Sequence, residues 1–387
     1  MTGARTLTGI TWNHTRGYLP LVAAAQRFTD RYPGMEIAWS RRSLQEFADY
    51  PIQDLAERFD FIIIDHPFVG YAAKHPTLLP LDEVLPAAYL AGQAANSVGA
   101  SYRSYEYGGH LWALPTDAAT PVASWRADVL AAHGAEVPRT WEDLLALARR
   151  GLVALPAIPV DALMATYMLC IALGEEPFTT PERMAAPATA RGALEMLREL
   201  LSHCEAACLE RNPIRTYEAM TARDDLAYCP FAYGYSNYAR PSYTAPRPHL
   251  TFGNLVTFNG ARLRSTLGGT GLAITRRVSA DLLPLAAEYA AYVNHPDTQR
   301  GLYTLDGGQP GHRSAWTDDV CNALAGHFFR DTLTTLDEAF LRPRYAGYIY
   351  FQDEAGAIVH RWLGEGGDAA PVIDRIDALY RETLAHA

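Results

Sequence analysis

Lysine is almost absent from this chain: among its 387 residues the one lysine is Lys74, and the other basic residues are arginines. Schiff-base enzymes need a lysine amine, so the sequence offers a single candidate for that chemistry. The 43 acidic residues outnumber the 33 basic ones and give a formal net charge of -10. Without a basic surplus to neutralise phosphates, the composition argues against a nucleic-acid partner.

Cysteine is also scarce, with five residues in an odd count and in no spacing typical of a disulfide framework. This usage suits a reducing compartment. Cys204 and Cys208 are four residues apart, beside His203, and such a group could hold a metal. No second ligand pair accompanies them, so we expect a structural role and no metal site.

Long apolar runs are missing as well. No stretch approaches the roughly 20 apolar residues that a membrane-spanning helix needs, and the first residues contain no apolar segment of a signal peptide. As given, the chain is expected to be cytoplasmic; if a leader was removed, it would be periplasmic or extracellular.

The length favours two domains, and their organisation can be followed from residues 61–64, Phe-Ile-Ile-Ile. This unalternated apolar run predicts a strand buried on both faces, as in a parallel sheet covered by helices. Residues 7–12 and 36–39 predict two more strands, and a helix is expected to begin near Pro20 and to end before Tyr32. The alternation is that of βαβ units in an α/β fold.

Polar residues follow each of these strands. Since the carboxyl ends of parallel strands meet at one edge of a sheet, we expect these side chains to converge on one crevice that binds a ligand. They are Trp12, Asn13, His14 and Arg16 after the first strand, Arg41, Arg42 and Ser43 after the second, and Asp65 and His66 after the third. The alternative for Asp65 is a turn residue ahead of Pro67.

The second half of the chain adds further candidates. Thr140 is expected to cap a helix, and residues 161–211 have a helical pattern interrupted by a loop at 174–187. Tyr233, Tyr235 and Tyr238 belong to an aromatic run that either stacks on a ring-shaped ligand or packs against the core. Gly269 lies in a turn that lacks the features of a phosphate loop and indicates close backbone approach.

Several segments, in their order along the chain, resemble the family 1 extracellular solute-binding proteins of ABC importers. The resemblance is spread over essentially the whole chain and is carried by residues 28–37, 61–65, 78–82, 107–119, 125–130, 138–145, 268–274 and 307–313. The polar clusters after the strands resemble a leaderless, cytosolic subgroup of this family.

The resemblance implies a periplasmic binding protein-like type II fold, with two discontinuous α/β lobes, a hinge and an interlobe cleft. The N-terminal lobe would contain residues 1–116 and 265–312, and the C-terminal lobe residues 117–264 and 313–387. Asp117, Gly269 and Arg313 would then join the polar strand ends as ligand-binding residues, with the three tyrosines on the other lobe.

Two functions follow from this placement. The first, which we favour, is a monomeric solute-binding protein without cofactors that closes its lobes around a small polar ligand, a sugar or an anionic metabolite. If exported, it would have an ABC-transporter permease as partner. The alternative is a cytosolic enzyme on the same scaffold, a metal-independent lyase or transferase-like activity with Asp65, His66, His14 and Asp117 as acid-base groups.

Overall fold

The computed structural model describes residues 5–43 and 52–385 and divides into two compact units. Unit 1 comprises Met1–Ala119 and Gly268–Arg330, and unit 2 comprises Thr120–Leu267 and Asp331–Ala387. Compared with the predicted lobes, residues 117–119 and 313–330 group with unit 1, and residues 265–267 group with unit 2. At the start of the segment 313–330, the Arg313 amide donates to the Asn96 carbonyl of unit 1 at 2.7 Å.

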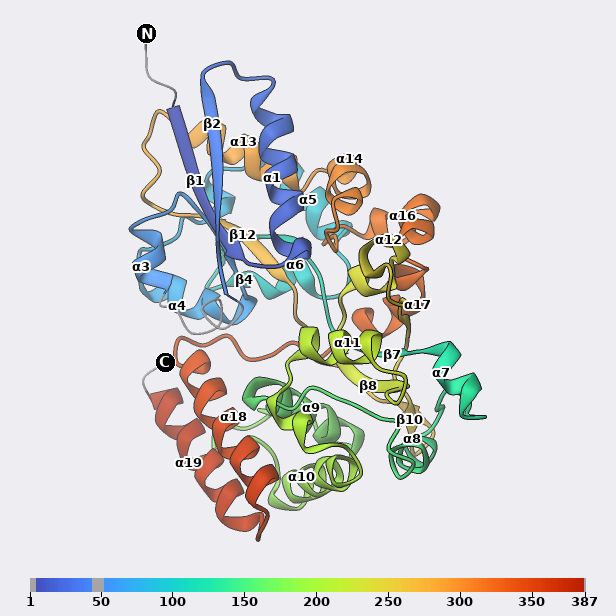
Figure 1. Ribbon diagram of the computed structural model, residues 1–387. Coiled ribbons are helices and arrows are strands. Elements are labelled where there is room, and N and C mark those ends of the chain that lie inside the picture. The colour runs from blue at the N-terminus through green and yellow to red at the C-terminus, as the bar shows by residue number, and fades with distance from the viewer. Residues whose placement is uncertain (1–4, 44–51, 386–387) are drawn as a thin grey trace. The chain divides into compact units, whose positions relative to one another are not determined.

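Unit 1 is an α/β unit that begins with a strand and has helices between and after its strands (Figure 1). Its strands are β1 (Arg5–Trp12), β2 (Met35–Arg42), β3 (Phe61–Ile64), β4 (Glu106–Tyr107), β5 (His110–Leu111), β6 (Leu114–Asp117) and β12 (Thr270–Ile274). Its helical segments are α1 (Thr15–Thr29), α3 (Ile52–Ala56), η1 (His66–Phe68), α4 (Val69–Lys74), η2 (Leu81–Glu83), α5 (Ala87–Ala95), α6 (Ser101–Ser104), α13 (Leu283–Val293), α14 (Pro296–Thr298), η5 (Gln299–Tyr303), α15 (Arg313–Trp316) and α16 (Asp319–Leu324). α17 (Phe328–Asp337) contains the boundary at residue 330.

The main sheet of unit 1 has five strands in the order β2-β1-β3-β12-β6. β1 pairs in parallel with both β2 and β3, whereas β12 is antiparallel to both β3 and β6. Four strands therefore run in one direction, and β12, contributed by a segment far along the chain, is inserted between them. The parallel βαβ arrangement predicted for the first three strands is confirmed.

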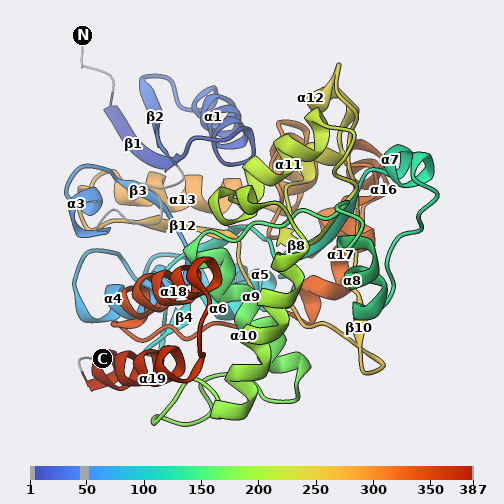
Figure 2. The ribbon, with the colours of Figure 1, turned by 60° about the horizontal axis from the view of Figure 1, so that its bottom comes forward.

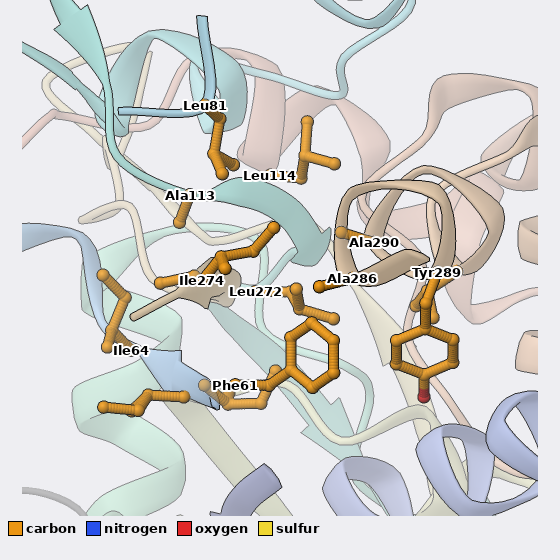
Figure 3. Packing of buried hydrophobic residues seen from close by; sticks show 14 of the residues in the cluster. Phe61, Ile64, Leu81, Ala113, Leu114, Leu272, Ile274, Ala286, Tyr289 and Ala290 are labelled. Atoms are coloured by element: carbon orange, nitrogen blue, oxygen red, sulfur yellow. The ribbon is translucent and has the colours of Figure 1, made fainter. Parts of the chain in front are cut away.

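β3 lies at the centre of the unit 1 core, as its apolar sequence predicts. All four of its residues are buried, and Figure 3 shows Phe61 and Ile64 among apolar side chains from β6, β12 and α13. The Phe61 ring contacts Tyr289 of α13 with centroids 5.2 Å apart. The strand carries no polar side chain until Asp65, so its chemistry is confined to its carboxyl end.

Two element boundaries differ from the prediction. α1 begins at Thr15, before Pro20, so residues that precede the predicted start form the first turn of the helix. The reason is that His14 caps this helix with its side chain. β2 also continues through Arg42, which places Arg41 and Arg42 inside the strand rather than after it.

Unit 2 combines a small antiparallel sheet with long helices, of which α9, α10, α18 and α19 pack together (Figure 2). Its strands are β7 (Pro121–Trp125), β8 (Tyr228–Tyr233), β9 (Thr251–Gly253), β10 (Thr257–Phe258) and β11 (Ala261–Arg262). Its helical segments are α7 (Ala127–Ala132), α8 (Trp141–Ala148), α9 (Pro159–Ala172), α10 (Pro187–Ser202), η3 (Ala206–Glu210), α11 (Pro213–Ala222), η4 (Ser236–Ala239), α12 (Pro241–Thr244), α18 (Tyr348–Glu365) and α19 (Ala370–Ala385).

The local predictions for unit 2 are largely confirmed. Thr140 caps α8 in a capping box with Asp143, and α9 and α10 flank the expected loop. Along residues 5–43 and 52–385, no helix combines the length and the apolar character needed to cross a membrane.

Candidate functional site

The carboxyl ends of the three parallel strands form one edge of the unit 1 sheet, which we call the rim. Trp12 at the end of β1 is in register with Arg42 at the end of β2, and Ile10 is in register with Ile62 of β3. The Asn13 amide donates to the Arg42 carbonyl at 2.7 Å and links the first two ends. These contacts bring the three strand ends to one edge of the sheet.

His14 lies at the rim as the N-cap of α1. Its Nδ1 accepts a hydrogen bond from the Arg16 amide at 3.0 Å. Burial, and secondly the charge of Arg16, lower the pKa of His14 to about 3. The imidazole is therefore neutral at physiological pH and a weak base, which argues against the predicted acid-base role.

Arg16 and Asp117 are both buried at the rim, where they form an ion pair. The Arg16 Nε donates to Asp117 Oδ2 at 2.7 Å, and a second guanidinium nitrogen donates to Oδ1. Burial raises the pKa of Asp117, while the charge and hydrogen bonds of Arg16 lower it. This bidentate pair connects the start of α1 to the end of β6, a structural role that the sequence did not indicate.

Asp65 and His66 are in contact, which the enzymatic alternative requires of an acid-base pair. Asp65 Oδ1 accepts from the His66 amide at 2.8 Å and lies 3.1 Å from the His66 Nδ1. The His66 ring is fully buried and meets the edge of Tyr105, whereas the Asp65 side chain is 25% exposed. Asp65 is thus both the predicted turn residue, as cap of η1, and a carboxylate accessible at the rim.

The remaining unit 1 candidates have different environments. Arg41 is exposed and its guanidinium lies over the Tyr18 ring, 5.2 Å from the centroid, a partner that sequence reasoning missed. Arg42 is buried, and Ser43 is the last described residue before the gap at 44–51. Arg313 is the first residue of α15, and its Nε donates to the Ser97 carbonyl at 3.4 Å. Arg313 therefore contacts the loop that follows α5.

The predicted tyrosines lie in unit 2, at and after the end of β8. Tyr233 contacts Thr266 through its hydroxyl at 3.2 Å, whereas Tyr238 is buried and donates to Glu218 at 2.8 Å. Tyr217 of α11 is the centre of this cluster, with ring centroids 5.2 Å from Tyr238 and 6.4 Å from Tyr235. For Tyr238 the arrangement favours the packing alternative.

Gly269 precedes β12 at the rim, with a positive φ of 90°. A Cβ at this position would lie 2.4 Å from the Asp117 carbonyl oxygen and 2.7 Å from the Ala118 Cα. The close backbone approach predicted for this turn is confirmed, since a side chain here would displace the end of β6.

We expect Gly269→Ala to lower the free energy of unfolding by about 2–3 kcal/mol, because backbone strain and a steric clash add. Gly34→Ala is the matched control, because Gly34 has a φ of 83° but open space around a Cβ. It should cost about 1 kcal/mol. Equal losses for the two variants in urea denaturation would show that close approach at Gly269 is not required.

A metal site is not supported. Among the described residues, no group of three or more histidine, cysteine, aspartate or glutamate side chains could hold a metal ion.

Comparison with known protein families identifies the family of this chain. The sequence profile described as "Bacterial extracellular solute-binding protein" matches residues 23–325, most of the chain and most of unit 1. The chain belongs to the bacterial extracellular solute-binding proteins. The resemblance inferred from the ordered segments is thereby confirmed.

Solved structures confirm the periplasmic binding protein-like fold of this solute-binding protein. Maltose-bound MalE3 of T. maritima has 18% identity and a TM-score of 0.83, covering 98% of this chain and 100% of that chain. A solute-binding protein of Agrobacterium radiobacter K84 in complex with ribitol has 18% identity and a TM-score of 0.82, with 98% and 99% covered. The GacH receptor of Streptomyces glaucescens has 16% identity and a TM-score of 0.80, with 99% of each chain covered. No curated protein sequence matches the chain.

Proposed function

We propose that this solute-binding protein binds a small polyhydroxylated solute, a sugar or sugar alcohol, at the rim of unit 1. The observation that carries the proposal is the register of β1, β2 and β3, which brings a partly exposed carboxylate and the arginine-bearing end of β2 to one edge. Carboxylates and guanidinium groups bind hydroxyl groups through charge-assisted hydrogen bonds. Maltose, ribitol and tagatose, named with three of the similar structures, are all polyols.

The enzymatic alternative is less well supported by the arrangement of its groups. His14 is held neutral as a helix cap, and Asp117 is engaged in a buried ion pair. Asp65 and His66 would remain as one acid-base pair, without a second group for proton transfer from the predicted set. The family description supports export, and we infer that a monomer delivers its solute to an ABC-transporter permease.

We expect Asp65→Asn to weaken binding of the polyol about 10- to 100-fold, because it replaces a charge-assisted hydrogen bond with a neutral one. Asparagine caps helices as well as aspartate does, so the melting temperature should change by a few degrees at most. Isothermal titration of maltose, ribitol and tagatose against both proteins measures the effect.

Asp30→Asn is the matched control, because Asp30 is an exposed carboxylate at the other end of α1 and should leave affinity unchanged. Binding of none of the three polyols would refute the proposed ligand class. Undiminished affinity in Asp65→Asn would instead remove Asp65 from the site, and collapse of the fold would show that it acts only as a cap.

A further inference from the structure

Thr270, the first residue of β12, lies at the rim next to Asp65. β12 is antiparallel to β3, with Gly271 in register with Ile64, so Thr270 and Asp65 are the next residues at the same end of the two strands. On the other side of β12, Thr270 is in register with Asp117 of β6. Thr270 therefore occupies the rim between the ends of β3 and β6.

The hydroxyl group of Thr270 is buried without a hydrogen bond. The residue is 8% exposed, and within the part of the chain that the structure describes its Oγ1 has no hydrogen-bond partner. Other buried threonines of unit 1 do have one. Thr11 Oγ1 donates to the Gly17 carbonyl at 2.9 Å. Thr275 Oγ1, just after the end of β12, donates to the Phe59 carbonyl at 2.8 Å.

A buried hydroxyl group without a partner costs free energy, because it has lost its hydrogen bonds to water and gained none in the protein. Such a group at the edge where a ligand is expected has a simple use. An oxygen atom of a bound solute would supply the missing partner, so the cost in the free protein would become a gain in the complex.

The backbone at Thr270 is irregular, which supports a functional role for this side chain. The pairing of β12 with β6 shifts register between Thr270 and Gly271, as in a β-bulge. Bulges are frequent next to functional sites, where they change the direction of a side chain. The preceding Gly269 lies against the backbone of Asp117, which fixes the start of β12 against β6.

We propose that Thr270 determines specificity at the polyol site by donating its hydroxyl hydrogen to a hydroxyl oxygen of the solute. The inference rests on the function proposed above. An ionised Asp65 can only accept hydrogen bonds, whereas the hydroxyl group of Thr270 can donate one. Each hydroxyl group of a sugar or sugar alcohol both donates and accepts, so the two side chains together match neighbouring hydroxyl groups of such a solute.

Thr270→Val tests the proposal, because valine has nearly the same shape as threonine and lacks the hydroxyl group. We expect the affinity for the bound polyol to fall about 10-fold, as measured by isothermal titration with maltose, ribitol and tagatose. The melting temperature of the ligand-free protein should stay the same or rise, since the substitution removes a buried polar group that costs free energy. Thr270→Ser keeps the hydroxyl group and should bind within about threefold of the unaltered protein.

Thr275→Val is the matched control, because Thr275 follows the opposite end of β12 and its hydroxyl group is already bonded to Phe59. This variant should melt a few degrees lower and bind the polyol with unchanged affinity. The two threonine-to-valine variants thus have opposite expected effects, one on affinity and the other on stability.

Equal polyol affinity in Thr270→Val and the unaltered protein would overturn the inference and leave the proposed function intact. A loss of affinity that Thr270→Ser shares would also overturn it, because the hydroxyl group would then not be the cause. So would a lower melting temperature of Thr270→Val, which would show that the hydroxyl group stabilises the free protein. If none of the polyols binds the unaltered protein, the proposed function and this inference are both refuted.

Discussion

Replacing Arg16 with alanine is expected to destabilise the protein by about 3–5 kcal/mol, because it leaves the buried Asp117 carboxylate without its partner. The side chains are 4% and 0% exposed and make two hydrogen bonds to each other, so the charge left behind could not be solvated. Urea denaturation monitored by circular dichroism measures the loss. Part of it should be recovered at low pH, where Asp117 becomes protonated.

The double variant Arg16→Met with Asp117→Leu is the matched control. It removes both charges and fills similar volume with apolar groups, and such replacements of buried ion pairs are commonly neutral or stabilising. We expect it to be more stable than Arg16→Ala. The free energy of unfolding of Arg16→Ala could instead lie within about 1 kcal/mol of that of the unaltered protein, with polyol affinity lost. That result would show that Arg16 is a ligand-binding residue, as the sequence predicted.

The Arg16–Asp117 pair is a long-range contact that could not be predicted from the sequence. The strand at residues 61–64, its parallel neighbours and the polar character of their ends follow from apolar periodicity and turn chemistry, which act locally. The pairing of two residues 101 positions apart depends on the strand order, with β12 from the second half of the chain inserted before β6. Nothing in the residues near Arg16 encodes that strand order. From the sequence alone, Arg16 is therefore expected to contact a ligand and not Asp117.

The same reasoning explains the correction at α1. Pro20 is typical of a first helical turn, and that preference placed the predicted start too late. The capping bond from the Arg16 amide to His14 decides the actual start, and histidine is an uncommon cap that propensity does not indicate. The predicted fold class is correct despite this error, because it depends on ordered segments along the whole chain and not on the start of one helix.

Asp161 is expected to make the protein less stable as pH rises. It lies in the first turn of α9, where an acidic residue is ordinary, but here the residue is buried, and this burial raises the pKa of its carboxyl from 3.8 to about 8. Within the described residues, its Oδ2 has no hydrogen-bond partner. The folded state therefore holds a proton that the unfolded state releases.

The sign and size follow from proton linkage. The folded state binds more protons between the two pKa values, so stability is greatest below the lower value and declines with increasing pH until the upper value is passed. The decline is about 1.4 kcal/mol per pH unit in that window. Between about pH 5 and about pH 7, the unaltered protein should lose about 3 kcal/mol relative to Asp161→Asn, whose side chain does not ionise.

Urea denaturation of both proteins at about pH 5, 6 and 7 gives this difference and cancels the titration of all other groups. Glu354→Gln is the matched control, because it removes an exposed carboxylate from α18 of the same unit. A difference between Asp161→Asn and the unaltered protein that does not change with pH would mean that Asp161 is ionised in the folded state.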